Sequence, residues 1–125
     1  MIEKIEREYY FNGNIKCEEY YLRGKLHRED GPAIIWYYED GELKKEDYYV
    51  DGKRHRTDGP AWANYNKNGN VEYERYYQNN VLHRIDGPAI THYNDNGDVK
   101  YKLYFINGIE YTDIFKWMVE VGCLK

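Results

Sequence analysis

The chain has 125 residues, of which 42% are hydrophobic and 32% charged, and its formal net charge at pH 7 is −4. This balance is typical of one soluble globular domain and excludes a wholly disordered chain. The acidic charge argues against a nucleic-acid partner, because nucleic-acid binders usually present a basic face. The sequence contains neither an apolar run long enough to cross a bilayer nor an apolar leader segment. We therefore expect no membrane insertion and a cytoplasmic location.

The strongest pattern is the phrase His-Arg-x-Asp-Gly-Pro-Ala, which occurs three times. Its copies begin at His27, His55 and His83, so they are 28 residues apart. A fixed period of this size indicates a stack of similar supersecondary units. We therefore predict that residues 1–125 form one repeat domain. Its units span about residues 1–30, 31–58, 59–86 and 87–111.

Each unit is expected to contain two antiparallel strands. Asn12-Gly13 and the equivalent Asp-Gly or Asn-Gly pair of each later unit are strong signals for a tight hairpin. Odd positions of the longer strand are largely apolar, so we predict that this face is packed, although Lys45, Asp47 and Arg75 interrupt it. The longer strands are predicted at Ile15–Leu22, Leu43–Val50, Val71–Gln78 and Val99–Ile106, and the shorter ones at Ala33–Tyr38, Ala61–Asn66 and Ala89–Asn94.

The repeat ends in a different element. Thr112 and Asp113 precede the apolar run 114–121, and Gly122 follows it. A side-chain oxygen before such a run indicates a helix start, and a glycine after it indicates a stop. We predict a mostly β fold: an elongated antiparallel β-hairpin array of 28-residue units with a C-terminal capping helix at about residues 112–122. That helix, or a sheet edge, is the expected surface for any homo-oligomer.

The repeat resembles a known family. Glu18–Gly24 reads Glu-x-Tyr-Tyr-x-x-Gly, and Gly-x-x-x-x-x-Asp-Gly-Pro-Ala begins at Gly24. This pattern resembles the MORN repeat variant over roughly residues 9–111, although the units here are longer by an inserted Leu-His-Arg-x stretch. The family includes MORN-like antitoxins of bacteria, and related arrays occur in phage and viral genomes. The resemblance implies a meander of hairpins that acts as a scaffold, adaptor or binding module and not as an enzyme.

The His-Arg-x-Asp phrase is first interpreted as a structural device. Equivalent histidines of successive units are expected about 10 Å apart, too far to share one metal ion, so we predict no metal, no cofactor and no catalytic residue. The aspartate is expected to accept backbone N–H bonds, the histidine to donate to a carbonyl, and the glycine to supply unusual dihedral angles. One alternative is a hydrolase that uses the histidine and aspartate. Another is a row that binds an anionic small molecule or nucleic acid, formed by His27, Arg28, His55, Arg56, His83 and Arg84.

The candidate protein-binding surface is aromatic. Tyrosine and tryptophan set among charges are typical of protein interfaces. The candidates are Tyr20, Tyr48, Tyr76 and Tyr104, with nearby Trp36 and Trp62. We therefore predict a non-enzymatic protein-binding module that acts as an inhibitor, an antitoxin or a phage-encoded antagonist of a host protein. The alternative is that the tyrosines only stack as cross-strand ladders.

Three other residues lead to smaller predictions. His92 stands in a column with Trp36 and Asn64 and is expected to be a solvated strand residue. Cys17 and Cys123 belong to opposite ends of the array, so an extended stack places them about 30 Å apart, beyond disulfide reach.

Overall fold

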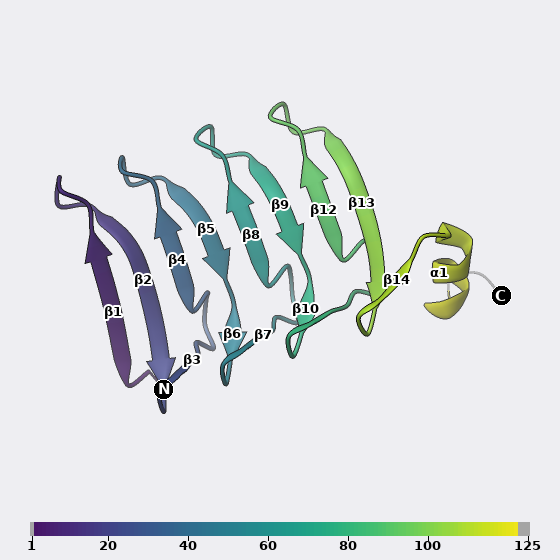
Figure 1. Ribbon diagram of the computed structural model, residues 1–125, viewed down its shortest axis with the longest axis horizontal. Helices are drawn as coiled ribbons and strands as arrows, with labels where there is room; N and C mark the ends of the chain where they lie inside the picture. The colour runs from purple at the N-terminus through teal and green to yellow at the C-terminus, as the bar shows by residue number, and fades with distance from the viewer. Residues whose placement is uncertain (1, 123–125) are drawn as a thin grey trace.

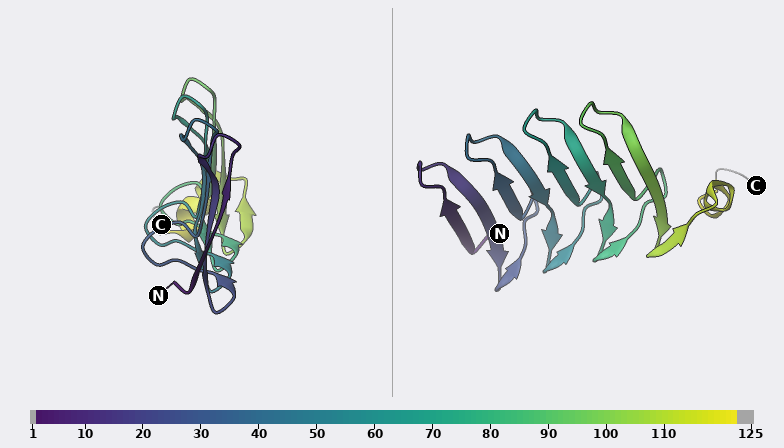
Figure 2. Two further views of the ribbon diagram at one scale, coloured as in Figure 1. Left: turned by 90° about the vertical axis from the view of Figure 1, so that its left-hand side faces the viewer. Right: turned by 45° about the horizontal axis from the view of Figure 1, so that its top comes forward.

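The computed structural model describes residues 2–122 as a row of antiparallel hairpins that lie side by side. Figure 1 shows these hairpins along the long axis of the molecule, and the turned view in Figure 2 shows that the sheet is a single layer. The predicted architecture, an elongated antiparallel β-hairpin array with a C-terminal helix, is therefore confirmed.

The strands repeat the same order in each unit. The main sheet has the order β1-β2-β4-β5-β8-β9-β12-β13-β14, with β3 paired to β2, while β6-β7 and β10-β11 form separate two-stranded ladders. The strands are β1 (Lys4–Tyr9), β2 (Ile15–Leu22), β3 (Lys25–Leu26), β4 (Ile34–Tyr37), β5 (Leu43–Asp47), β6 (Tyr49–Val50), β7 (Lys53–Arg54), β8 (Trp62–Tyr65), β9 (Val71–Arg75), β10 (Tyr77–Gln78), β11 (Val81–Leu82), β12 (Ile90–Tyr93), β13 (Val99–Ile106) and β14 (Ile109–Tyr111).

The prediction of two strands per unit is incomplete, because a third short strand follows the long one. The predicted strand 43–50 is also divided at Tyr48 into β5 and β6. The reason lies in the Tyr48 backbone, whose N–H donates to the Ala61 carbonyl while its carbonyl accepts from the His55 N–H. The long strand thus changes partner at Tyr48: β5 pairs with β8 of the next unit, and β6 pairs with the short strand β7 of its own unit. The hairpin turns follow the prediction, since Gly41 has a φ of +94°, a value that favours glycine.

The register assigns every strand residue to one of two faces, because directly paired residues of antiparallel strands point to the same side. We call one side the loop face; it carries Glu18, Ile35, Glu46, Ala63, Glu74 and Thr91. The other side, the Trp62 face, carries Cys17, Trp36, Lys45, Asn64, Tyr73 and His92, and on the adjacent row Ile34, Asp47, Trp62, Arg75 and Ile90.

The prediction that one face is packed is wrong. A one-layer sheet has no second layer, so residues become buried only beneath neighbouring side chains and loops. Cys17 and Asp47 are buried on the Trp62 face, whereas Glu18 is buried on the loop face. The most deeply buried small residues are alanines of the repeated phrase, Ala33 and its equivalents, each 0% exposed.

The helix α1 (Ile114–Glu120) closes the C-terminal end of the array (Figure 1). Its N-cap is Asp113, whose carboxylate accepts a hydrogen bond from the Phe115 N–H. Trp117 is buried, and its ring lies 4.8 Å from that of Tyr104. In residues 2–122 we find no helix with the length and apolar character needed to cross a membrane. The expectation for Cys123 lies outside the described residues, whereas Cys17 is a buried free thiol.

Candidate functional site

The arginine of each repeated phrase folds back over a tyrosine of its own unit. The guanidinium carbon of Arg28 lies 4.1 Å from the centre of the Tyr20 ring, and Arg56 and Arg84 stack on Tyr48 and Tyr76 at 4.0 Å. A guanidinium over an aromatic face is attracted by the ring quadrupole. Three of the four tyrosines proposed as a binding surface are thus partly covered by the protein's own loops.

The same arginine also holds its loop closed. Arg56 Nε donates to the Asp58 carboxylate at 2.9 Å, and Nη1 donates to the Pro60 carbonyl at 3.1 Å. A Cβ added at Gly59 would lie 2.8 Å from the Arg56 guanidinium carbon, so a side chain there would push the arginine away. The glycine thus leaves room for the arginine to fold over it, and it does not adopt the unusual dihedral angles that the sequence suggested. The arrangement recurs at Arg28 and Arg84.

Each histidine of the phrase accepts a hydrogen bond instead of donating one to a carbonyl. His27 Nδ1 accepts from the Asp51 N–H at 3.0 Å. His55 and His83 accept in the same way from the backbone of Asn79 and Asn107. These acceptors tie the phrase to the turn of the next unit, whose residues have positive φ. The histidine and the aspartate of one phrase thus have different partners. His27 itself lies 3.3 Å from a Glu29 carboxylate oxygen and 3.5 Å from one of Asp51, and the hydrolase alternative stays a prediction.

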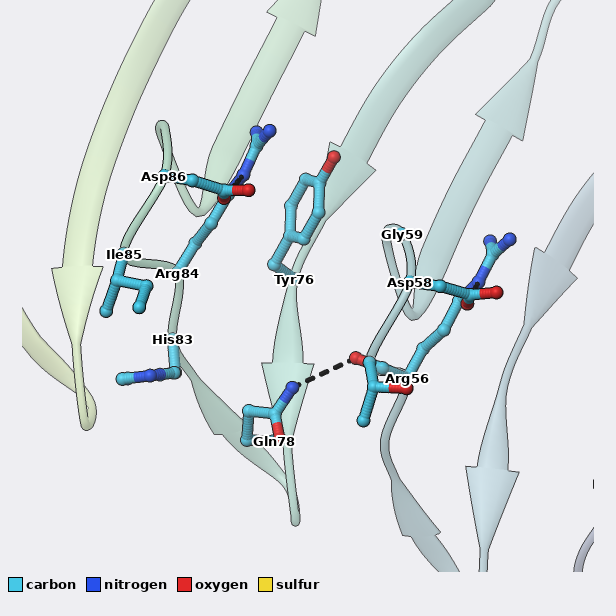
Figure 3. Close-up of a pocket in the computed structure, with 10 residues that line it drawn as sticks. Arg56, Asp58, Gly59, Tyr76, Gln78, His83, Arg84, Ile85 and Asp86 are labelled. Carbon is cyan, nitrogen blue, oxygen red and sulfur yellow. Dashed lines mark hydrogen bonds and ion pairs between the residues drawn. The ribbon is translucent and has the colours of Figure 1, made fainter.

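The guanidinium group of each repeated phrase pairs with the aspartate of the same phrase. Hydrogen bonding to the arginine two residues earlier lowers the pKa of Asp30, Asp58 and Asp86. Figure 3 shows the groove of about 500 Å³ between two successive loops, with Arg84 beside Tyr76 and with Arg56 and Asp58 across it. Because cations and carboxylates both line this groove, it offers an anion no surplus of positive charge. Anion binding by these loops stays a prediction that no contact of the structure favours.

A second repeated contact lies on the loop face. The hydroxyl of Tyr65 donates to Glu46 at 2.8 Å, and the equivalent bonds join Tyr37 to Glu18 and Tyr93 to Glu74. Burial, and then the hydrogen bond to the carboxylate, raise the pKa of Tyr37 and Tyr93 to about 12. These pairs cross from one hairpin strand to the neighbouring unit and therefore help to fix the register.

The structure separates the six aromatic candidates. Tyr20, Tyr48, Tyr76 and Tyr104 each follow Glu18 or its equivalent by two residues and therefore lie on the same loop face. Tyr104 is covered by Trp117 instead of an arginine. Trp36 and Trp62 lie on the opposite face. One partner surface cannot contact both sets at once on a single-layer sheet.

The Trp62 face carries a row of stacked rings, which we call the aromatic row: Trp62, Tyr73, His92 and Tyr101. Trp62 and Tyr73 are parallel within 2°, with their centres 6.5 Å apart. Tyr73 stacks on His92 at 4.0 Å, and His92 meets the edge of Tyr101 at 5.1 Å. The row crosses β8, β9, β12 and β13, so it extends over two units.

Cations surround the first ring of the row. Arg75 lies 4.4 Å from the Trp62 ring, Lys45 5.1 Å and Arg54 5.4 Å. Lys45 and Arg54 both pair with the buried carboxylate of Asp47. In the described part of the chain Arg75 has no acidic partner, and its Nε is buried without a hydrogen bond. The Trp62 Nε1 and His92 Nδ1 atoms are likewise buried and unbonded.

Reasoning from the sequence missed most of this row. His92 was expected to be solvated, but it is half-buried between two tyrosine rings. Arg75 was treated as an interruption of an apolar face, whereas it stacks on Trp62. No signal in the sequence alone would have shown this row, because it depends on the strand register, in which Trp62 is paired with Arg75, and Tyr73 with both Asn64 and His92.

Comparison with known proteins gives one match. A family model described as the MORN repeat variant matches residues 2–23 and 34–51, which comprise β1, β2, β4, β5 and β6. No curated protein and no solved structure matches the chain. The matched segments are therefore MORN-like repeats, and the period of 28 residues extends the pattern along the chain. MORN repeats are generally non-catalytic modules that often bind other molecules. Within residues 2–122, no group of three His, Cys, Asp or Glu side chains is placed to hold a metal ion.

Proposed function

We propose that this protein is a non-enzymatic module that binds a protein partner through the aromatic row and Arg75. The observation that carries the proposal is a set of stacked rings and an arginine without an acidic partner on a sheet face that no second layer covers. Tryptophan, tyrosine and arginine supply most of the binding energy in protein interfaces. The MORN-like repeats support a binding role.

The partner that fits this face presents an acidic side chain beside an apolar surface. The acid would pair with Arg75, which already lies against the Trp62 ring and is therefore held in place. Charge-assisted bonds to a held guanidinium lose little side-chain freedom. The exposed part of Tyr101, 39% of its surface, lies at the far end of the same row and supplies apolar contact.

The biological role that we propose is inhibition: the protein acts in the cytoplasm as an inhibitor, an antitoxin or a phage-encoded antagonist of a host protein. This part of the proposal is supported by the resemblance of the repeats to MORN-like arrays and by the acidic composition. It predicts that expression of the chain lowers the activity of the protein that it binds.

The test is affinity capture from the native host, followed by calorimetry with the purified partner. The wild type and Lys53→Glu, an exposed site away from the row, should bind the same protein. Arg75→Glu should reduce the affinity by about 100-fold, since one charge pair becomes a repulsion. Binding that Arg75→Glu leaves unchanged would overturn the proposal, as would failure of the wild type to bind any host protein.

A further inference from the structure

The first strand, β1, is an open edge of the sheet. It is the first strand in the order and pairs with β2 along one side only, and all six of its residues are exposed. In Figure 1 it lies at the left end of the array, and no other strand of residues 2–122 lies beyond it. An edge of this kind presents unpaired N–H and C=O groups that can pair with another strand.

The direction of the free backbone groups follows from the ladder. Tyr20 of β2 directs its N–H to the Ala33 carbonyl and its carbonyl to the His27 N–H, so both groups face away from β1. Ile5 lies directly opposite Tyr20. In an antiparallel ladder such a pair turns its backbone groups away from each other. The Ile5 groups, and by alternation those of Arg7, therefore point out of the sheet edge.

The charges along this edge are arranged as a complementary palindrome. Glu3, Lys4, Ile5, Glu6 and Arg7 read negative, positive, apolar, negative, positive. When the segment is reversed, each negative position meets a positive one. An antiparallel copy centred on Ile5 thus places Lys4 opposite Glu6 of the other chain, while Ile5 meets its own equivalent. Glu3 then lies opposite Arg7, whose guanidinium also donates to Glu18 of its own chain at 2.8 Å.

The hydrogen-bond direction and the charge order select the same register. With Ile5 on a two-fold axis normal to the sheet, the two Ile5 residues exchange N–H···O bonds, and paired side chains share a face. Opposite charges directly across an antiparallel pair are stabilising, and the 43% exposed Ile5 gains an apolar neighbour. Lys4 and Glu6 are already held together along the strand at 2.6 Å, so both are oriented before pairing.

The other end of the sheet lacks this complementarity. Lys100 and Lys102 of β13 carry the same sign and lie on one face, because they are two residues apart in a strand. Like charges on an edge oppose pairing with a copy. The last three residues of β13 pair with β14, beside which α1 lies (Figure 1). The β13 edge therefore disfavours pairing with a copy, whereas the β1 edge is self-complementary.

We propose that β1 pairs with β1 of a second copy of this chain, forming a two-fold symmetric dimer whose sheet is continuous across the axis. This interface is separate from the Trp62 face, so the dimer presents two copies of the aromatic row. A symmetric contact uses the same patch on both subunits and closes at two chains.

The test exploits the palindrome with two charge-reversed variants. Lys4→Glu places two acids opposite each other, and Glu6→Lys places two lysines opposite each other, so each variant alone should be monomeric. A mixture of the two restores opposite charges at both positions and should form a heterodimer. Sedimentation velocity at low ionic strength measures all three samples, and Lys100→Glu on the opposite edge is the matched control.

We expect the wild type and Lys100→Glu to be dimers, and each reversed variant to dissociate at least tenfold more readily. Ile5→Pro removes only an outward N–H and should give a folded monomer, as circular dichroism can verify. A wild type that is monomeric at about 100 μM would overturn the proposal, since that corresponds to an association of negligible strength. A dimer that survives Ile5→Pro would also overturn it, as would a mixture of the reversed variants that stays monomeric.

Discussion

Replacing Arg56 by alanine tests the role assigned to the repeated phrase. The substitution removes the guanidinium from the Tyr48 ring, which is worth about 1 kcal/mol for a partly covered pair. It leaves the Pro60 carbonyl without its donor, at a cost of about 1 kcal/mol. The ion pair with Asp58 adds little, because that carboxylate is 83% exposed and water screens the pair. We therefore expect a loss of about 2 kcal/mol in the free energy of unfolding.

Urea unfolding followed by circular dichroism measures this loss, with three variants as comparisons. Arg56→Lys keeps the charge but cannot hold Asp58 and the Pro60 carbonyl with one planar fork, so it should lose roughly half as much. Asp58→Asn and the exposed Lys53→Ala should each lower stability much less than Arg56→Ala does. If Arg56→Ala lowers the free energy of unfolding no more than Asp58→Asn does, Arg56 does not hold its loop closed.

Three further predictions concern other parts of the array. The pKa of Tyr37 and Tyr93 is raised to about 12, so the contribution of these tyrosines to the free energy of unfolding is complete below about pH 10 and is lost as the pH rises towards 12. The midpoint of urea unfolding should therefore be lower at pH 11.5 than at pH 9, and Tyr93→Phe should reduce that difference. Trp117→Ala should cost about 3 kcal/mol and speed hydrogen exchange near Tyr104, and unchanged exchange in β13 and β14 would contradict the capping role. Burial, aided by Glu19 and Glu8, raises the pKa of Cys17 to about 11, so iodoacetamide at pH 8 should label it about 100-fold more slowly than in urea, as peptide mass spectrometry can show.

The period of the sequence predicted the architecture, because a fixed spacing requires identical connections between units. The turn at Gly41, the strand Ile15–Leu22 and the helix start at Asp113 also followed from local signals. These features depend on residues that are close in the chain, which is why composition and spacing were sufficient for them.

The contacts of the site depend on register and were not predictable in the same way. Arg28 reaches Tyr20 only because the short strand β3 folds back on β2, and the sequence was interpreted without that strand. The separation of Trp62 from Tyr48 onto opposite faces follows from the pairing of Trp62 with Asp47. Alternation defines the two sides of one strand, but only the register between strands shows which sides coincide.

Hydroxyl-radical footprinting of the complex with the captured partner tests the central claim most directly, since it reports which face of the single-layer sheet becomes covered. The proposal predicts that oxidation of Trp62, Tyr73 and Tyr101 falls on binding, while Ile85, 57% exposed in the third repeated loop, stays as reactive as in the free protein. Protection of Ile85 and the loop face, with the aromatic row still reactive, would contradict it.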